Sequence, residues 1–154
     1  MTNLIVLDGY FITLQKLSFE HLEELAQVAQ NPIIWRNLPI EGWQRPIFNK
    51  WITKSLQEQE NGNALVFVII EAATNRIIGT TRFQDICHEH RKTDIGWTWF
   101  APEAWGLGFN LEAKNMMLTH AFENWNVLKV GFKVDERNLR IDREMGEVFL
   151  SWCT

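Results

Sequence analysis

Hydrophobic residues recur with a period of two in some stretches of the chain and with a helical period in others, and these periods predict its elements. Ser18 is a suitable N-cap for the first helix, and Asn31-Pro32 ends that helix. The apolar run 64–70 is rich in β-branched residues and too short for a core helix, so it predicts a central strand. In chain order, the pattern predicts a strand at 9–17, helices at 19–30 and 46–61, strands at 64–70, 76–84 and 93–100, a helix at 111–125, a strand at 128–134, a weak helix from Asn138 and a short strand at 148–153.

This order, in which three strands follow one another directly, favours a mixed sheet with helices on its faces and an α+β fold class (broadly α/β). The chain of 154 residues has no internal repeat and no linker-like segment, so it is expected to form a single domain, 1–154. Within the strand at 93–100, strict alternation places Ile95, Trp97 and Trp99 on one face of the sheet and Asp94 and Thr98 on the other.

Composition and charge narrow the class of protein. The chain is 46% hydrophobic and 22% charged, as in ordinary globular domains, and its net charge of −4 favours neither nucleic acid nor an anionic membrane as a partner. The N-terminal residues lack the pattern of a signal peptide, and Cys87 and Cys153 have no metal-binding spacing. The expectation is a cytoplasmic protein with reduced thiols.

The stretch from Trp105 to Asn110 contains two glycines between a predicted strand and a predicted helix. Such a turn leaves backbone N–H groups pointing outward at a helix N-terminus, which favours an anion such as a pyrophosphate. A dinucleotide fingerprint requires a small residue where Leu111 stands, and a P-loop requires Lys followed by Ser or Thr, which is missing. An acyl-CoA site and a plain connection without a ligand remain open on these residues alone.

The residues around the turn carry a more specific pattern. The series Ala101-Pro102, Trp105-Gly106-x-Gly108 and Asn110-x-Glu112-Ala113-Lys114 resembles the RimJ/RimL-like branch of the GNAT acetyltransferases. Positions 76–81 resemble the preceding strand of that family, and 128–138 resemble its next strand and the Asn that follows. The resemblance implies the GNAT acyl-CoA N-acyltransferase fold, a mixed and mostly antiparallel sheet flanked by helices.

The same resemblance implies a co-substrate site for acetyl-CoA, without a metal. Phe100 and Ala101 would offer backbone groups to the pantetheine arm, and Asn138 would contact the co-substrate near its thioester. The superfamily prefers Gln or Arg at the first turn position and Gly or Ala at the last, whereas this branch commonly has Trp and Asn there. The residues that would wrap the pyrophosphate are Trp105, Gly106, Leu107, Gly108, Phe109 and Asn110.

Acetyl transfer to an amine needs a base, and GNAT enzymes typically use a carboxylate. Asp94 is the candidate base because it lies on the strand before the turn, on the face opposite to the tryptophans. The alternative for Asp94 is a solvated carboxylate at the strand edge. Glu103 in the following loop is a second candidate for the base. His88-Glu89-His90 is expected to form a solvated hairpin tip rather than a metal site.

Three of the eight tryptophans belong to segments that cover the acceptor cleft in this family. Trp35, Trp43 and Trp97 are therefore candidates to bind the acceptor, with packing in the core as the alternative for each.

The resemblance ends after Arg140, where the family has a longer helix and two more strands. The domain is therefore expected to be incomplete beyond about residue 140, with its last strands missing and an unpaired sheet edge. The function predicted is acetyl transfer from acetyl-CoA to a primary amine, either a protein N-terminal α-amine or a small molecule. Two alternatives stay open: a catalytically impaired acyl-CoA-binding remnant, and a non-enzymatic domain that pairs through its open edge. The protein could also form a homodimer, and the sequence leaves this alternative open.

Overall fold

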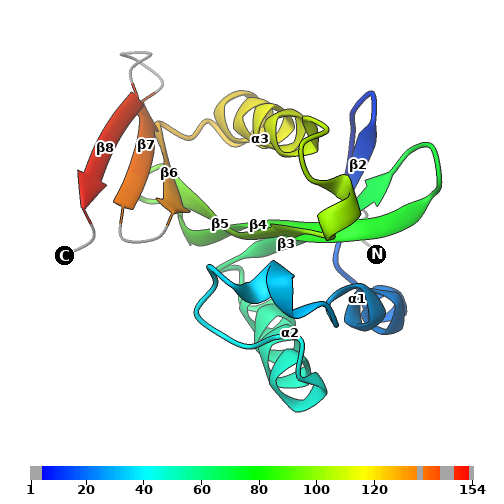
Figure 1. The fold of residues 1–154 in the computed structure, drawn as a ribbon. Coiled ribbons are helices and arrows are strands. Elements are labelled where there is room, and N and C mark those ends of the chain that lie inside the picture. The colour runs from blue at the N-terminus through cyan, green and yellow to red at the C-terminus, as the bar shows by residue number, and fades with distance from the viewer. Residues whose placement is uncertain (1–4, 135–136, 143–147, 153–154) are drawn as a thin grey trace.

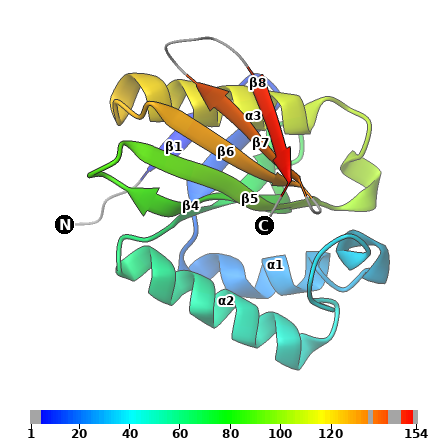
Figure 2. The ribbon, with the colours of Figure 1, turned by 90° about the vertical axis from the view of Figure 1, so that its left-hand side faces the viewer.

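One sheet with helices on both of its faces forms the molecule (Figure 1). The computed structural model describes residues 5–134, 137–142 and 148–152. Helix α3 (Phe109–Thr119) covers one face, and helices α1 (Leu22–Val28) and α2 (Arg45–Glu60) cover the other, as both views show (Figures 1 and 2). The strands are β1 (Val6–Asp8), β2 (Ile12–Lys16), β3 (Leu65–Glu71), β4 (Arg76–Cys87), β5 (Lys92–Phe100), β6 (Lys129–Val134), β7 (Arg137–Asp142) and β8 (Val148–Trp152).

The strands lie in the sheet in their chain order, from β1 to β8. Neighbouring strands are antiparallel except for β5 and β6, which are parallel because the chain crosses over through α3 between them. Strands β3, β4 and β5 form the meander that the sequence predicts, and the mixed, mostly antiparallel sheet is confirmed.

The parallel pairing of β5 with β6 is short. It joins Lys92–Ile95 to Lys129–Phe132 and stops there, so the second half of β5 has no partner on that side among the described residues. In Figure 1, strands β6 to β8 turn away from the plane of β3 to β5 toward α3. The pairing of β5 with β6 therefore ends at Ile95 and Phe132.

A bulge in β5 changes the predicted alternation of its side chains. Gly96 pairs with Arg82 and Trp99 pairs with Thr80, so β5 has one residue more than β4 between these pairs. Trp97 takes a φ of 49° within this stretch. The prediction that Ile95 and Trp99 share a face is therefore wrong, because an extra residue reverses the alternation that follows it.

The two faces of the sheet carry two separate cores. Phe67, Phe83 and Ile95 pack under α3 with Ala113 and Met117, whereas Val66, Val68 and Trp99 pack under α1 and α2. The alternation along β3 supplies both cores at once, since all of its first five residues are buried.

Several short elements surround these layers. A 3₁₀ turn at Phe19–His21 precedes α1, and Asn31 caps a second one at Pro32–Trp35 by accepting a hydrogen bond from the Ile33 N–H. A third 3₁₀ turn spans Pro102–Ala104, and a π-helical turn at His120–Asn124 ends the helix that follows the glycine turn. The predicted boundaries of the first three helices thus hold to within a few residues.

The C-terminal part differs from the expectation in two respects. The predicted helix from Asn138 is wrong, because Arg137–Asp142 forms strand β7 antiparallel to β6. Strand β8 pairs with β7 in turn, so two strands follow β6 rather than being missing, and β6 is not an edge. In β7 the apolar Leu139 and Ile141 alternate with polar neighbours, which is the period of a strand and not of a helix. Cys153 lies outside the described residues.

Candidate functional site

The glycine turn leads directly into α3. Gly106 has a φ of 76° and Gly108 a φ of 82°, a left-handed conformation that glycine adopts without strain. Gly108 is the N-cap residue of α3, and no side chain caps the helix. Apart from its chain neighbours, a Cβ built on either glycine would meet no atom of the described residues within 4 Å, so open space lies in front of the turn. The turn therefore fits a phosphate held by backbone N–H groups and the helix dipole.

Glu112 and Ala113, which follow the turn, explain how α3 is held on the sheet. The carboxylate of Glu112 accepts hydrogen bonds from the N–H groups of Phe11 (3.0 Å) and Ile12 (2.9 Å), at the start of β2. Ala113 is fully buried, and its small side chain lets the helix approach the sheet closely. Glu112 and Ala113 thus fix on the sheet the helix that begins at the turn.

A pocket of about 390 Å³ occupies the opening beside the second half of β5. Its volume lies in the range of small-molecule sites. It is lined from both faces of the sheet, by the segment after α1 on one side and by the glycine turn and α3 on the other. The lining residues are Ile34, Asn37, Leu38, Ile95, Gly96, Trp97, Thr98, Trp99, Phe100, Trp105, Asn110, Lys114 and Phe132.

Four of the residues predicted from the sequence meet in this pocket: Trp97, Phe100, Trp105 and Asn110. The indole Nε1 of Trp105 donates a hydrogen bond of 2.8 Å to the Phe100 carbonyl, which ties the turn to the end of β5.

The other turn residues have different surroundings. Leu107 is exposed, whereas Phe109 is buried in the core under α3. Ala101 is buried next to the pocket, and its N–H donates to the Ile78 carbonyl at 2.7 Å, which occupies that donor.

Of the remaining predicted residues, Trp35, Trp43 and Asp94 are described and do not line the pocket. Trp35 is buried beneath it and donates a hydrogen bond from Nε1 to the Ala29 carbonyl, and Trp43 is 39% exposed. Asp94 lies earlier on β5 and borders a separate hollow together with Lys129. Asn138 lies in β7, with its side chain outside what the structure describes.

Glu103 and the segment from His88 to His90 both lie in exposed turns. Glu103 is exposed in the 3₁₀ turn before the glycines, and His88 to His90 lie in the exposed turn between β4 and β5. Within the described residues, no three His, Cys, Asp or Glu side chains are grouped so as to hold a metal ion.

Lys114 also lines the pocket, although no role for it was predicted from the sequence. Its Nζ donates a hydrogen bond of 2.6 Å to Thr98 Oγ1, whose hydroxyl is also hydrogen-bonded to Thr81 at 2.8 Å. The ring of Phe132 lies 6.0 Å from the same nitrogen. Burial lowers the pKa of Lys114 to about 7. The available signal was the spacing of Lys114 four residues after Asn110, which places both residues on one face of the helix.

The low pKa of Lys114 predicts a measurable pH dependence of stability. Between pH 7 and pH 10.5, its ordinary value, the unfolded chain binds more protons at this lysine than the folded chain does. The free energy of unfolding should therefore rise with pH across this window. In a Lys114→Met variant this contribution is absent, so the wild type should gain about 2 kcal/mol relative to the variant between pH 7 and pH 9. Urea unfolding at both pH values measures the difference.

The matched control for this measurement is Lys50→Met, which removes an exposed lysine from α2. This control should stay within about 0.5 kcal/mol of the wild type at both pH values. A Lys114→Met variant that follows the wild type equally closely would show that the buried amine is charged throughout.

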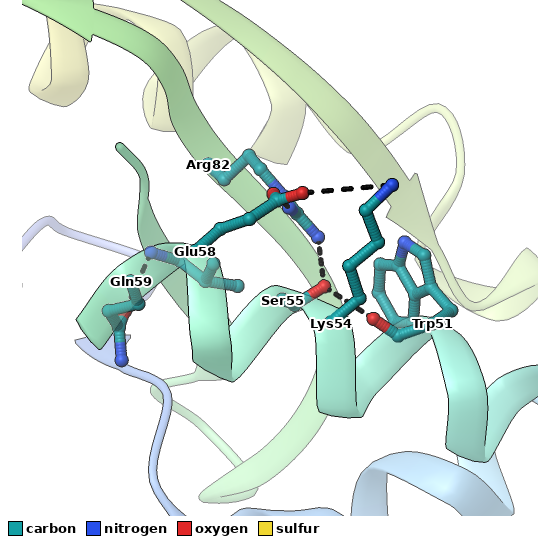
Figure 3. Close-up of polar contacts among 7 residues, drawn as sticks. Trp51, Lys54, Ser55, Glu58, Gln59 and Arg82 are labelled. Carbon is teal, nitrogen blue, oxygen red and sulfur yellow. Dashed lines mark hydrogen bonds and ion pairs between the residues drawn. The ribbon is translucent and has the colours of Figure 1, made fainter. Parts of the chain in front are cut away.

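A buried arginine supports the opposite wall of the pocket. Arg82 on β4 is 2% exposed, and its guanidinium donates hydrogen bonds to Glu58 (3.2 Å) and Ser55, both on α2 (Figure 3). The guanidinium carbon lies 5.5 Å from the ring centroid of Trp51 and 5.8 Å from that of Trp97. Burial lowers the pKa of Arg82 to about 10, against the opposing effect of Glu58. Arg82 thus holds the indole of Trp97, which lines the pocket.

The open sheet with a glycine turn at its splayed strands is the architecture of the acyl-CoA N-acyltransferase fold. A family model described as the acetyltransferase (GNAT) domain matches residues 12–146. The chain therefore belongs to the GNAT acetyltransferase family.

Similar proteins agree with this assignment. An uncharacterised N-acetyltransferase, p20, from Bacillus licheniformis is 26% identical over 128 residues, covering 82% of this chain and 71% of p20. A GCN5-related N-acetyltransferase from Brucella melitensis has a TM-score of 0.73 at 17% identity, over 82% of this chain and 58% of that one. RimL, a ribosomal L7/L12 α-N-protein acetyltransferase in complex with coenzyme A, has a TM-score of 0.73 at 15% identity, over 92% of this chain and 78% of that one. The two solved structures show the fold.

In the described part of the chain, no helix is both long enough and apolar enough to cross a membrane.

Proposed function

We propose that the protein is an acetyl-CoA-dependent N-acetyltransferase that acetylates a primary amine. The observation that carries this proposal is the pocket through the sheet, which has the uncapped glycine turn at one end. An elongated ligand with an anionic group suits this shape, because its charged part would meet backbone N–H groups and its narrow part would enter the opening.

In this proposal, each segment that lines the pocket binds a different section of the co-substrate. The glycine turn and the first turn of α3 would hold the pyrophosphate. The second half of β5, which has no pairing with β6 among the described residues, would offer its backbone edge to the pantetheine arm. Acetyl-CoA supplies an activated acetyl group as a thioester. Asn138 is proposed to contact the co-substrate near its thioester, and Asp94 is proposed as the base.

The acceptor would enter from the face of the sheet that carries α1 and α2. There Ile34, Leu38 and Trp97 line the pocket, and Trp97 is held by Arg82. Trp35 and Trp43, from the same segment, are proposed to shape the approach to this entrance. The RimJ/RimL-like pattern in the sequence and the likeness to RimL support a protein N-terminal α-amine as one class of acceptor; a small-molecule amine is the other. The proposed setting is the cytoplasm.

Two measurements on the purified protein test this function. Isothermal calorimetry with acetyl-CoA should show binding, and a thiol assay should show release of coenzyme A when a panel of N-terminal peptides and small amines is added. Binding without thiol release for any amine would favour an impaired acyl-CoA-binding domain. An absence of binding would overturn both and favour a domain that acts by contact with a partner.

A further inference from the structure

Lys114 places an amine along the path that leads from the glycine turn into the pocket. It follows Asn110 by four residues, so both side chains lie on the same face of α3, and both line the pocket. Asn110 belongs to the turn that faces the proposed pyrophosphate. On the far side of the pocket are Ile34 and Leu38, from the other face of the sheet. A chain that is anchored at the turn and reaches the far side therefore passes the amine of Lys114.

The surroundings of this amine favour its nucleophilic form. Its Nζ donates a hydrogen bond to Thr98 Oγ1, and the ring of Phe132 on β6 lies 6.0 Å away. Among the described lining residues, Lys114 is the one titratable group, so no carboxylate in the pocket stabilises an ammonium. Burial lowers its pKa to about 7, which makes the neutral amine abundant at slightly alkaline pH.

We propose that Lys114 is a site of self-acetylation, at which the protein takes the acetyl group from acetyl-CoA bound in its own pocket. This inference rests on the proposed function. In the step, Lys114 Nζ attacks the thioester carbonyl carbon, a C–N bond forms, and the C–S bond breaks with its electron pair on sulfur. The proton that nitrogen loses goes to the thiolate, so the products are an amide and free coenzyme A.

The modification changes the pocket in which it occurs. An acetylated Lys114 carries no basic nitrogen and adds an acetyl group to a space of about 390 Å³. The added group takes up room that the co-substrate needs, so modified molecules should bind acetyl-CoA more weakly than unmodified ones. Self-acetylation would thus limit the activity of the protein.

Mass spectrometry of the wild-type protein tests the proposal directly. The protein is incubated at pH 8 with acetyl-CoA that carries ¹³C in its acetyl group, which distinguishes new acetylation from any present beforehand. Peptide mapping then follows Lys114 and, as internal controls, the exposed Lys50 and Lys54 of α2. Lys114 should be labelled at least about tenfold faster than the controls, because most of its amine is neutral at this pH whereas ordinary lysines are almost fully charged.

Two further arms separate a reaction in the pocket from reaction in solution. Excess unlabelled coenzyme A should suppress labelling of Lys114 and leave that of Lys50 unchanged. Acetyl phosphate, which lacks the coenzyme part, should label the exposed lysines in preference to Lys114.

The outcomes distinguish a failure of self-acetylation from a failure of the proposed function. An unlabelled Lys114 in a protein that binds acetyl-CoA by calorimetry would overturn self-acetylation and leave the proposed function standing. Labelling of Lys114 that coenzyme A does not suppress would also overturn it. A protein that binds no acetyl-CoA would overturn the proposed function, and the inference with it.

Discussion

Replacing Gly108 by Val is expected to weaken the binding of acetyl-CoA severely. Gly108 has a φ of 82° and open space in front of its Cα, which is where the proposed pyrophosphate would lie. A valine side chain would occupy this space and separate the phosphates from the N–H groups of the first turn of α3. The loss of two charge-assisted hydrogen bonds, at about 1.5–3 kcal/mol each, would weaken binding by roughly a hundredfold or more. Calorimetry measures the affinity.

The chain contains a matched control for this substitution. Gly62 follows α2 with a φ of 81°, and a Cβ there would also meet no atom within 4 Å. Both variants force a β-branched residue into the left-handed region, at a similar cost in stability of about 1–2 kcal/mol. Gly62→Val should nevertheless bind acetyl-CoA as the wild type does. Equal affinity in the Gly108→Val variant would refute the assignment of the pyrophosphate site.

Replacing Arg82 by Ala is expected to lower the free energy of unfolding by about 3–5 kcal/mol. The guanidinium fills a buried space between α2 and β4 and lies close to the rings of Trp51 and Trp97, so its removal leaves a cavity and ends both cation–π contacts. The partners of Arg82 lose less, because Ser55 still donates to the Trp51 carbonyl and the side chain of Glu58 is about one third exposed. Denaturant unfolding measures the change.

Two variants of this experiment separate packing from charge. Arg76→Ala removes an exposed arginine from the same strand and should change stability by no more than about 0.5 kcal/mol. Arg82→Met keeps most of the side-chain volume and should recover part of the loss. If Arg82→Ala were as stable as Arg76→Ala, the guanidinium would not be what holds Trp97 in the wall of the pocket.

Local periodicity predicted most of the elements correctly. The meander of β3, β4 and β5, the start of α2 near Pro46 and the end of the first helical segment at Asn31 all follow from patterns within a few residues of each site. The prediction failed at 137–142, where a weak helix was expected from Asn138 although Leu139 and Ile141 alternate with polar neighbours. It also missed β1, because three residues are too few to show a period.

In the candidate site too, some residues could be recognised from the sequence and others could not. The glycine turn and the residues after it could be recognised from the sequence because they are contiguous and because positive φ, helix capping and close packing each demand a particular residue type. Lys114 and Arg82 could not be assigned a place, since each acquires its surroundings from segments far away in the chain. The positions of Asp94 and Trp43 away from the pocket likewise depend on the path of the whole strand or loop.

By itself, then, the sequence determined the class of fold and the glycine turn at the start of α3, and its resemblance to the GNAT acetyltransferases implies acetyl-CoA as the co-substrate. Only the tertiary structure decided that β5 and β6 part after Ile95, that the bulge near Trp97 turns Trp99 to the other face, and that an amine lies in the opening. The physical reason is that backbone conformation and helix capping act over a few residues, whereas strand register and burial depend on contacts between distant segments.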